Sequence, residues 1–356
     1  MKQKRAREFG IKVGRLPTGP LNKITDVAGV TVGHCTVDTN EHKTGVTVVL
    51  PCPENPFTHK LPAAAFVWNG FGKTAGLVQV EELGRLESPI ALTNTLNVGK
   101  VHDALVEHLL QRTAEEGGKL TSVNPIVCEC NDATLNRITE RVVGQKEVFT
   151  AIERACIDFQ EGDVGGGKGM ICHGLKGGMG SASRVLTFDG KEYTVGVLMQ
   201  TNHGSLEDLT IQGKNIGPAL TGTVAAGKPD KGSCIGILAT DLPLDSRQLG
   251  RVARRLSVGL ARLGSYVGHG SGEVFLAFST ANPYVSGEKA VTYPVTAFRE
   301  EDIDPVFRAA AECAEEAALN AMLTSNTVTG WQGEVIYSLK DLWRPEFAPT
   351  APADGI

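Results

Sequence analysis

The sequence lacks the long apolar runs of membrane proteins and the positive charge of nucleic-acid-binding proteins. None of its segments approaches the roughly 20 apolar residues needed to cross a bilayer, and no secretory leader follows the basic amino terminus. The formal net charge is −5, so the chain has no electrostatic attraction for nucleic acid or an anionic membrane. We therefore expect neither as a partner.

The eight cysteines include no Cys-x-x-Cys pair. The neighbours His34-Cys35 and Cys172-His173, and the segment 128–130, match no common zinc-binding spacing. Without a leader, the cysteines are typical of reduced thiols in a cytoplasmic protein, several of them buried. We expect no metal and no cofactor.

A nucleotide-binding loop is also missing. Residues 162–169 nearly match a P-loop, but Gly169 replaces the serine or threonine that would hold magnesium. The residues before it are polar, and Met170-Ile171-Cys172 after it looks like a strand, not a helix. We interpret the segment as a glycine-rich bend, with residues 177–184 as the next turn of the same kind.

The chain has enough apolar residues for one large hydrophobic core. Of its 356 residues, 41% are hydrophobic and 21% are charged. No repeat or long linker divides residues 1–356, which favours a single domain. Helical periodicity or capping patterns predict three helices, one of them opened by a capping box from Asp245 to Gln248 and one by Asp304-Pro305. The helices are expected at 98–113, 246–263 and 304–323, and short strands at 45–50, 63–68, 125–128, 193–199, 234–240 and 273–278. Without strict β-α-β alternation, these elements predict a layered, mixed α/β fold.

The dipeptide Gly232-Ser233 separates a polar linker (227–231) from an apolar strand (234–240). If the bond before Ser233 were cut, the serine would carry a hydroxyl nucleophile beside a free amine. A terminal amine titrates near about 8, so it can act as the general base for its own hydroxyl. The alternative is an ordinary Gly-Ser turn before a strand.

Other polar residues stand at expected strand ends. Asn202 follows the strand 193–199 and either donates to an oxyanion or makes an Asx-turn. Ser271 and Glu273 are two residues apart, so they face one side of a strand; they either orient a nucleophile or are a turn serine and a solvated glutamate. Glu129 and Asn131 either rim a substrate site or mark a strand exit.

Taken together and in order, these segments resemble the S58 family of self-processing serine aminopeptidases, which includes L-aminopeptidase/D-esterases and β-peptidyl aminopeptidases. The resemblance covers roughly residues 6–325. It rests on residues 16–34, 92–95, 164–167, 176–178, 181–184, 232–233 and 270–273. It implies a four-layer α-β-β-α sandwich, similar to that of the amino-terminal-nucleophile hydrolases and the ornithine acetyltransferases.

The resemblance also implies a function for each candidate residue. The chain would cut itself between Gly232 and Ser233 into residues 1–232 and 233–356, which stay together and form homo-oligomers. Ser233 would be the nucleophile, and Asn202 would assist processing and stabilise the oxyanion. Ser271 and Glu273 would hydrogen-bond around the nucleophile. Glu129 matches the carboxylate that holds the substrate's amine, and Glu273 is the alternative for that role. Substrates would be small peptides, amides or esters.

The chain departs from the family's pattern at Lys73, where relatives often have an acidic residue, and at Asn131, where some have a tyrosine. The tail after about Thr327, with Trp331 and Trp343, has no counterpart in the resemblance.

Three alternatives follow from the same residues. An acyltransferase would pass the acyl group to an amine instead of water. A cut one bond later would make Cys234 the nucleophile. An unprocessed homologue would be a non-catalytic binding protein.

Overall fold

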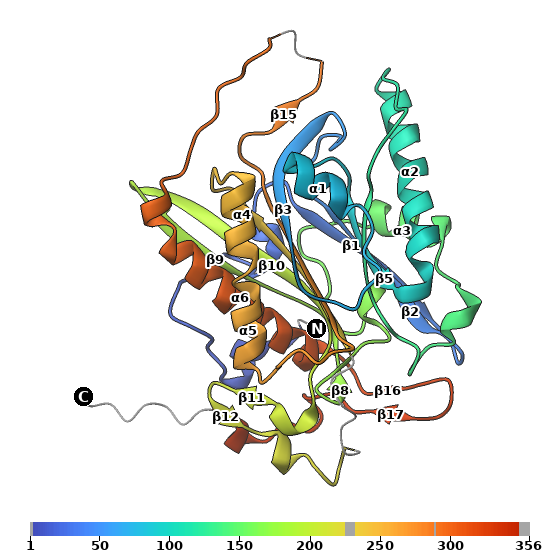
Figure 1. Cartoon of the computed structure of the whole chain (residues 1–356). Helices are drawn as coiled ribbons and strands as arrows, with labels where there is room; N and C mark the ends of the chain where they lie inside the picture. Colours follow the sequence, from blue (N-terminus) through green and yellow to red (C-terminus); the bar gives the residue numbers. More distant parts are fainter. Residues whose placement is uncertain (1–2, 225–231, 288–289, 349–356) are drawn as a thin grey trace.

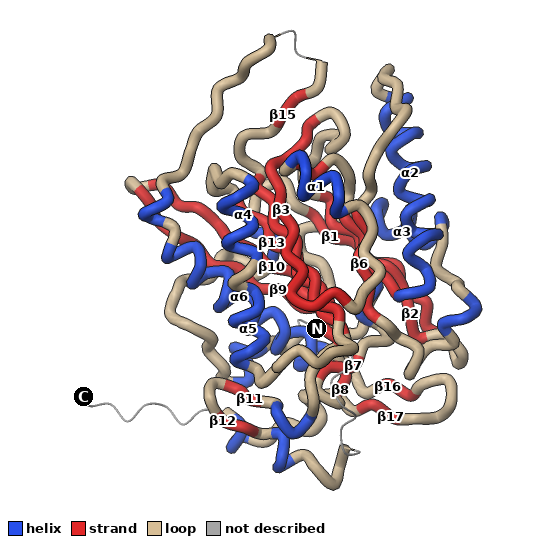
Figure 2. The backbone as a smooth tube through the Cα atoms, in the orientation of Figure 1, coloured by secondary structure: helices blue, strands red, loops and turns tan. Residues whose placement is uncertain are grey.

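Two β-sheets lie face to face, with helices on both outer sides (Figures 1 and 2). We describe a computed structural model, covering residues 3–224, 232–287 and 290–348. The smaller sheet has four strands in the order β1 (Thr31–Asp38), β2 (Lys43–Leu50), β5 (Ile90–Asn94) and β6 (Ile126–Cys130). Its outer face is covered by helices α2 (Val98–Glu115) and α3 (Gln145–Glu153).

The larger, seven-stranded sheet carries the other helical layer. Its strand order is β15 (Tyr284–Val285), β3 (His59–Gly70), β14 (Gly272–Ser279), β13 (Ser233–Thr240), β10 (Lys191–Asn202) and β9 (Gly178–Phe188), with β4 (Arg85–Leu86) paired to β3. Helices α4 (Ser246–Ala253), α5 (Leu256–Arg262) and α6 (Asp304–Thr324) form that layer. The smaller elements are α1 (Leu77–Leu83) and the strand pairs β7–β8 (Ile171–Cys172, Leu175–Lys176), β11–β12 (Thr210–Ile211, Lys214–Asn215) and β16–β17 (Val328–Thr329, Val335–Ile336).

Three clusters of buried hydrophobic residues lie between these layers. Leu92 and Ile237 belong to the core between the two sheets. Val48 and Leu105 lie between the small sheet and α2–α3, and Leu238 packs in the core that includes the helices of the large sheet. The expected four-layer α-β-β-α sandwich is therefore confirmed.

Strand β13 explains why an apolar run follows Ser233. It lies between β10, to which it is antiparallel, and β14, to which it is parallel. All eight of its residues are buried. A strand covered on both faces reads as a continuous apolar run instead of an alternating one, and the sequence between Cys234 and Thr240 has that form.

The prediction of a second glycine-rich turn at 177–184 was wrong, because most of these residues belong to strand β9. Gly180 in this segment allows close packing against α6. A Cβ atom on Gly180 would lie 2.0 Å from the carbonyl oxygen of Ala317 and 2.4 Å from the nitrogen of Ala321. A glycine at this position lets the helix backbone rest directly on the strand.

The three expected helices are present, with two differences. The helix expected at 246–263 is divided at Arg254-Arg255 into α4 and α5, so that α4 packs on β3 and β14 while α5 packs on α6. The capping box at its start is confirmed: the nitrogen of Gln248 donates to Asp245 Oδ1 over 2.7 Å. Helix α6 begins at Asp304, and Ile303 takes the N-cap position expected for Asp304.

The tail after Thr327 packs on the rest of the molecule. Leu339 and Phe347 join the core beneath α6, and the Trp343 ring meets the Phe9 ring edge-on at 5.4 Å. Within the described residues, no helix is both long and apolar enough to cross a membrane.

Candidate active site

The register of the large sheet places Ser233 between two other candidate segments. Its partner on β10 is Asn202, and its partner on β14 is Gly272, which lies between Ser271 and Glu273. Ser233 is 5% exposed. Three of the segments singled out in the sequence therefore meet at one end of three adjacent strands.

Gly232 brings its carbonyl group into the same corner. Its oxygen accepts a hydrogen bond from the nitrogen of Gly272 over 3.1 Å. A Cβ atom at position 232 would fall 1.8 Å from the carbonyl oxygen of Asn202. Only glycine permits this approach, and the backbone N–H of Gly272 is a donor aimed at the carbonyl of the Gly232–Ser233 bond.

The side-chain amide of Asn202 is fixed by two hydrogen bonds. Its Oδ1 accepts from the nitrogen of Ile171 over 2.8 Å, and its Nδ2 donates to the carbonyl oxygen of Asn131 over 3.1 Å. The acceptor bond therefore reaches across to strand β7, not to a residue just beyond Asn202, as an Asx-turn would require. Among the residues that the structure describes, the second amide hydrogen of Nδ2 has no acceptor and could donate to a further group.

Ser271 and Glu273 contact each other, as their spacing predicts. The hydroxyl of Ser271 donates to Glu273 Oε1, and both residues are fully buried. Asn69, at the end of β3, holds the loop before them: its Nδ2 donates to the carbonyl oxygens of Ser271 and of Gly268. A buried carboxylate of this kind is not the solvated glutamate of the alternative interpretation.

Glu129 lies near the end of β6 and is 3% exposed. Its Oε1 accepts from the backbone nitrogen of Lys73 over 3.0 Å, and its Oε2 accepts from the hydroxyl of Thr95. The ammonium group of Lys73 itself lies 4.8 Å from the centre of the Phe71 ring. Lys73 therefore contacts Glu129 through its backbone and presents its charge to an aromatic face.

Asn131 contributes its backbone rather than its amide. Its side-chain Oδ1 accepts from the nitrogen of Ala133 over 3.0 Å, in an exposed turn. Its carbonyl oxygen holds Asn202. The sequence analysis assigned no role to Asn69 or Thr95, although Thr95 lies in the segment 92–95 on which the resemblance rests.

Contacts between these segments join the two sheets at one end. Cys130 Sγ lies 3.8 Å from the carbonyl oxygen of Gln200, and Asn131 contacts Asn202. A Cβ atom on Gly272 would lie 2.7 Å from the carbonyl oxygen of Phe71, so the loop next to Glu129 also touches the loop next to Ser233. The candidate residues therefore form one neighbourhood.

Burial controls the charges around this neighbourhood. It raises the pKa of the Cys128 thiol to about 12 and that of Cys130 well above its ordinary value, so both thiols flanking Glu129 are neutral. It lowers the pKa of His203, the neighbour of Asn202, well below its usual range. It raises the pKa of Asp132 to about 6, although hydrogen bonds from Thr44, Asn136 and Asn94 oppose that shift.

The glycine-rich segment 162–169 does not cradle a phosphate. Gly165–Gly167 form a single 3-10 turn packed against β2. The ammonium group of Lys168 lies 3.0 Å from Asp163 and 2.7 Å from Asp38, so acidic side chains already neutralise it. The structure agrees with the interpretation of this segment as a bend.

Two surface cavities lie elsewhere. One of about 290 Å³ lies beside the start of α4, with Arg85, Asp245 and Phe298 in its lining. Another of about 280 Å³ is lined by residues near the amino terminus, Arg5 and Lys23 among them, and by residues 158–161. Neither lining includes the candidate residues at the end of β13.

Comparison with known proteins decides the family. The model of peptidase family S58 matches residues 22–336, which extends beyond the resemblance into the β16–β17 hairpin. The chain belongs to peptidase family S58. It is 38% identical over 358 residues to the beta-peptidyl aminopeptidase BapA of Sphingosinicella xenopeptidilytica, a match that covers 94% of this chain and 88% of that protein.

Solved structures agree with this assignment. The PH0078 protein of Pyrococcus horikoshii OT3 superposes with a TM-score of 0.90 at 45% identity, over 95% of this chain and 97% of that one. The L-aminopeptidase D-Ala-esterase/amidase of Ochrobactrum anthropi, described as a prototype of the serine aminopeptidases and a variant of the Ntn hydrolase fold, superposes at 0.89 with 36% identity, over 96% of both chains. This chain is therefore a serine hydrolase. Its function is that of an aminopeptidase with an amino-terminal nucleophile.

Proposed function

We propose that the chain cuts its own Gly232–Ser233 bond and then uses Ser233 as the nucleophile of an aminopeptidase. The observation that supports this most is the sheet register, which sets Ser233 beside Asn202 and Gly272. The hydroxyl of Ser233 is adjacent to the bond, and the Gly232 carbonyl already accepts a hydrogen bond from Gly272. That N–H would stabilise the negative charge that develops on the oxygen during attack.

In the first stage, Ser233 Oγ attacks the Gly232 carbonyl carbon. The C–N bond breaks, the hydroxyl proton passes to the departing nitrogen, and the acyl group is left on oxygen as an ester. Water then hydrolyses the ester to give the Gly232 carboxylate and restores the hydroxyl. Ser233 becomes the first residue of the second fragment and carries a free amine.

In the second stage, the new amine of Ser233 removes the proton from its own hydroxyl as that oxygen attacks the substrate carbonyl. Asn202 Nδ2 donates to the oxyanion, since its orientation is fixed at both ends by Ile171 and Asn131. Ser271 and Glu273, next to Gly272, would orient the terminal amine. The tetrahedral intermediate then collapses: the substrate's C–N or C–O bond breaks, and the protonated amine of Ser233 gives its proton to the departing amine or alcohol. Water hydrolyses the acyl-enzyme, which releases the acid and restores the Ser233 hydroxyl.

The substrate would be a small peptide, amide or ester with a free amino group, held by the buried carboxylate of Glu129. Pairing a buried carboxylate with an ammonium ion gives a strong, charge-assisted bond. It would restrict cleavage to the first residue of a peptide. The beta-peptidyl aminopeptidase relative makes β-amino peptides the first substrates to test. We further propose that the processed protein is a cytoplasmic homo-oligomer.

Ser233→Ala tests the proposal directly. We expect this variant to keep the mass of the uncut chain and to hydrolyse no aminoacyl amide, whereas the wild type gives two fragments. Cys234→Ala is the matched control, because it alters the neighbouring residue and should still be cut, with serine at the new amino terminus. A Ser233→Ala protein that is cut or hydrolyses substrate at the wild-type rate would contradict the proposal.

A further inference from the structure

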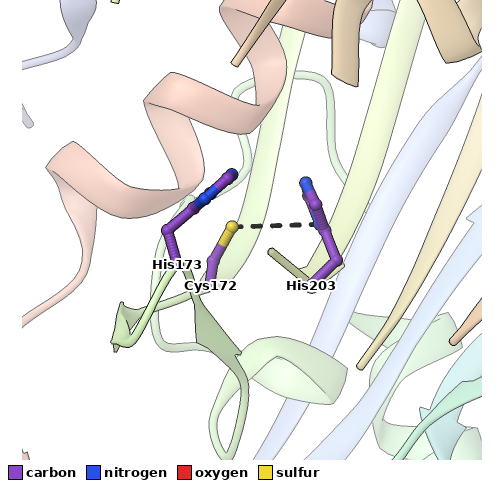
Figure 3. A group of neighbouring side chains, drawn as sticks. All are labelled: Cys172, His173 and His203. Atoms are coloured by element: carbon purple, nitrogen blue, oxygen red, sulfur yellow. Dashed lines mark hydrogen bonds between the residues drawn. The ribbon is translucent and has the colours of Figure 1, made fainter. Parts of the chain in front are cut away.

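Three buried side chains that the proposed mechanism does not use lie together beside Asn202. They are Cys172, at the end of β7, His173, which follows it, and His203, just after β10. Figure 3 shows the thiol of Cys172 pointing toward the His203 ring, with the His173 ring nearby. We propose that Cys172, His173 and His203 form a binding site for a zinc ion.

The spacing of the ligand atoms suits zinc. One ligand atom from each residue lies within 4.8 Å of the others. Cys172 Sγ is 3.8 Å from His203 Nδ1. A tetrahedral zinc, with bonds of about 2.3 Å to sulfur and about 2.0 Å to nitrogen, sets such atoms about 3.6 Å apart. Small side-chain rotations would bring the three atoms onto one ion.

The surroundings of His173 prepare one nitrogen to coordinate. Its Nδ1 lies 2.9 Å from the carbonyl oxygen of Ser205, so Nδ1 carries the hydrogen and Nε2 has the lone pair in the neutral ring. A carbonyl behind the non-ligating nitrogen is typical of histidines that bind metals. The backbone N–H of His173 also donates to the carbonyl oxygen of His203 over 2.7 Å, which ties the two ligand segments together.

His203 supplies the second, independent observation. It is 2% exposed, and its Nε2 is buried without a hydrogen-bond partner among the described residues. Within the described residues, Nε2 of this imidazole is therefore left unsatisfied. A zinc ion bound through Nε2 would satisfy that nitrogen directly, whereas zinc bound through Nδ1, the nitrogen near Cys172 Sγ, would leave the ring hydrogen on Nε2.

Coordination requires the thiolate of Cys172, so one proton leaves the protein as the Zn–S bond forms. The ion would then link Cys172, which follows Ile171, to His203, which follows Asn202. Ile171 donates the hydrogen bond that fixes the Asn202 amide. Zinc at this position would hold both sides of that contact.

Zinc binding is measurable without enzyme activity, so this inference can fail while the proposed function stands. The full-length Ser233→Ala chain and the wild type are titrated with Zn²⁺ against a chromophoric chelator. We expect one equivalent to bind, and affinity to fall at least tenfold in Cys172→Ser and in His203→Gln. Replacement by Co²⁺ should give a thiolate-to-metal absorption band that Cys172→Ser loses.

His42→Gln is the control, because Glu41, His42 and Glu140 form an exposed group that also has metal-ligand spacing. It should leave zinc affinity unchanged. The proposal is overturned if Cys172→Ser binds as tightly as its parent, or if His42→Gln abolishes binding. If a variant fails to fold, judged by circular dichroism, the Co²⁺ spectrum of the parent protein decides alone, and a spectrum without a thiolate band rejects the site.

Discussion

Asn202 illustrates how one residue depends on the ends of three strands. Its amide is oriented by the backbone of Ile171 on one side and of Asn131 on the other, so the donor does not have to reorganise as charge develops on the oxyanion. This preorganisation belongs to the neighbours as much as to Asn202, which is why a strand-end asparagine alone was an ambiguous signal.

Removing this donor should slow both stages of the proposed reaction. For Asn202→Ala we expect self-cleavage, followed by denaturing electrophoresis over time, and kcat on an aminoacyl amide each to fall about a hundredfold or more. Asn131→Ala is the control, since only its backbone oxygen contacts Asn202. It should process and turn over at close to the wild-type rate. Equal losses in the two variants would contradict the assigned role.

The buried carboxyl group of Asp132 should make the free energy of unfolding depend on pH. Burial raises its pKa to about 6 in the folded protein, from 3.8 ordinarily. The folded state therefore binds more protons than the unfolded state between these values. The stabilisation from protonated Asp132 is complete below about pH 4 and is lost as the pH rises through about 6, at up to about 1.4 kcal/mol per pH unit.

Asp132→Asn removes this titration. Urea unfolding between pH 4 and 7 should show the variant gaining stability relative to the wild type as pH rises, and no further change above about pH 7. Asp189→Asn, in an exposed turn, should follow the wild-type profile. Parallel profiles for all three proteins would show that Asp132 does not titrate in this range.

Helix α6 and strand β9 are joined by a buried charged contact. Arg184, on β9, is fully buried and lies 3.0 Å from Glu312 and 2.7 Å from Glu316, both on α6. The two carboxylates and burial act on the guanidinium in opposite senses, and the net effect raises its pKa.

Arg184→Met should leave Glu312 buried without its arginine partner and Glu316 paired with Arg7 alone. We expect a loss of about 3–5 kcal/mol in the free energy of unfolding, measured with urea at pH 7. Arg299→Met is a matched control, because the Arg299 side chain is 81% exposed and 4.0 Å from Asp302. Arg299→Met should lower the free energy of unfolding by less than about 1 kcal/mol. Similar costs for the two variants would show that the buried cluster contributes little.

At the scale of the whole molecule, the proposed cut falls between strands that interleave. Strands β3, β10 and β9 belong to residues 1–232, and β13 and β14, which lie between β3 and β10, belong to residues 233–356. Helix α6, from the second part, packs on β9 from the first. The fragments could separate only by opening the large sheet and its core.

Processed protein should therefore show two bands on denaturing electrophoresis but a single species in native mass spectrometry, containing both fragments in equal numbers. We expect the pair to unfold in one cooperative transition with urea. The uncut Ser233→Ala protein provides the reference for that transition. Fragments that separate in buffer without denaturant would contradict the interleaved sheet.

Local patterns were sufficient to predict the elements with strong periodicity. The spacing of Val101, Leu105 and Leu109 predicted α2, and all three residues are buried. The continuous apolar run after Ser233 predicted the central strand β13. The glycine-rich strand β9 gave no such pattern and looked like a turn. Its Gly180 is needed for close packing against α6, a contact with a distant segment that no local spacing shows.

The sequence by itself determined the family, the cut proposed at Gly232–Ser233 and the residue types available for catalysis, because these depend on short segments and their order. Tertiary structure alone decided which groups meet. Glu129 and Glu273 belong to different sheets, and Cys172 is far from His203 along the chain, yet sheet pairing and layer packing bring each set together. Contacts between distant segments depend on the whole core, which no local spacing encodes.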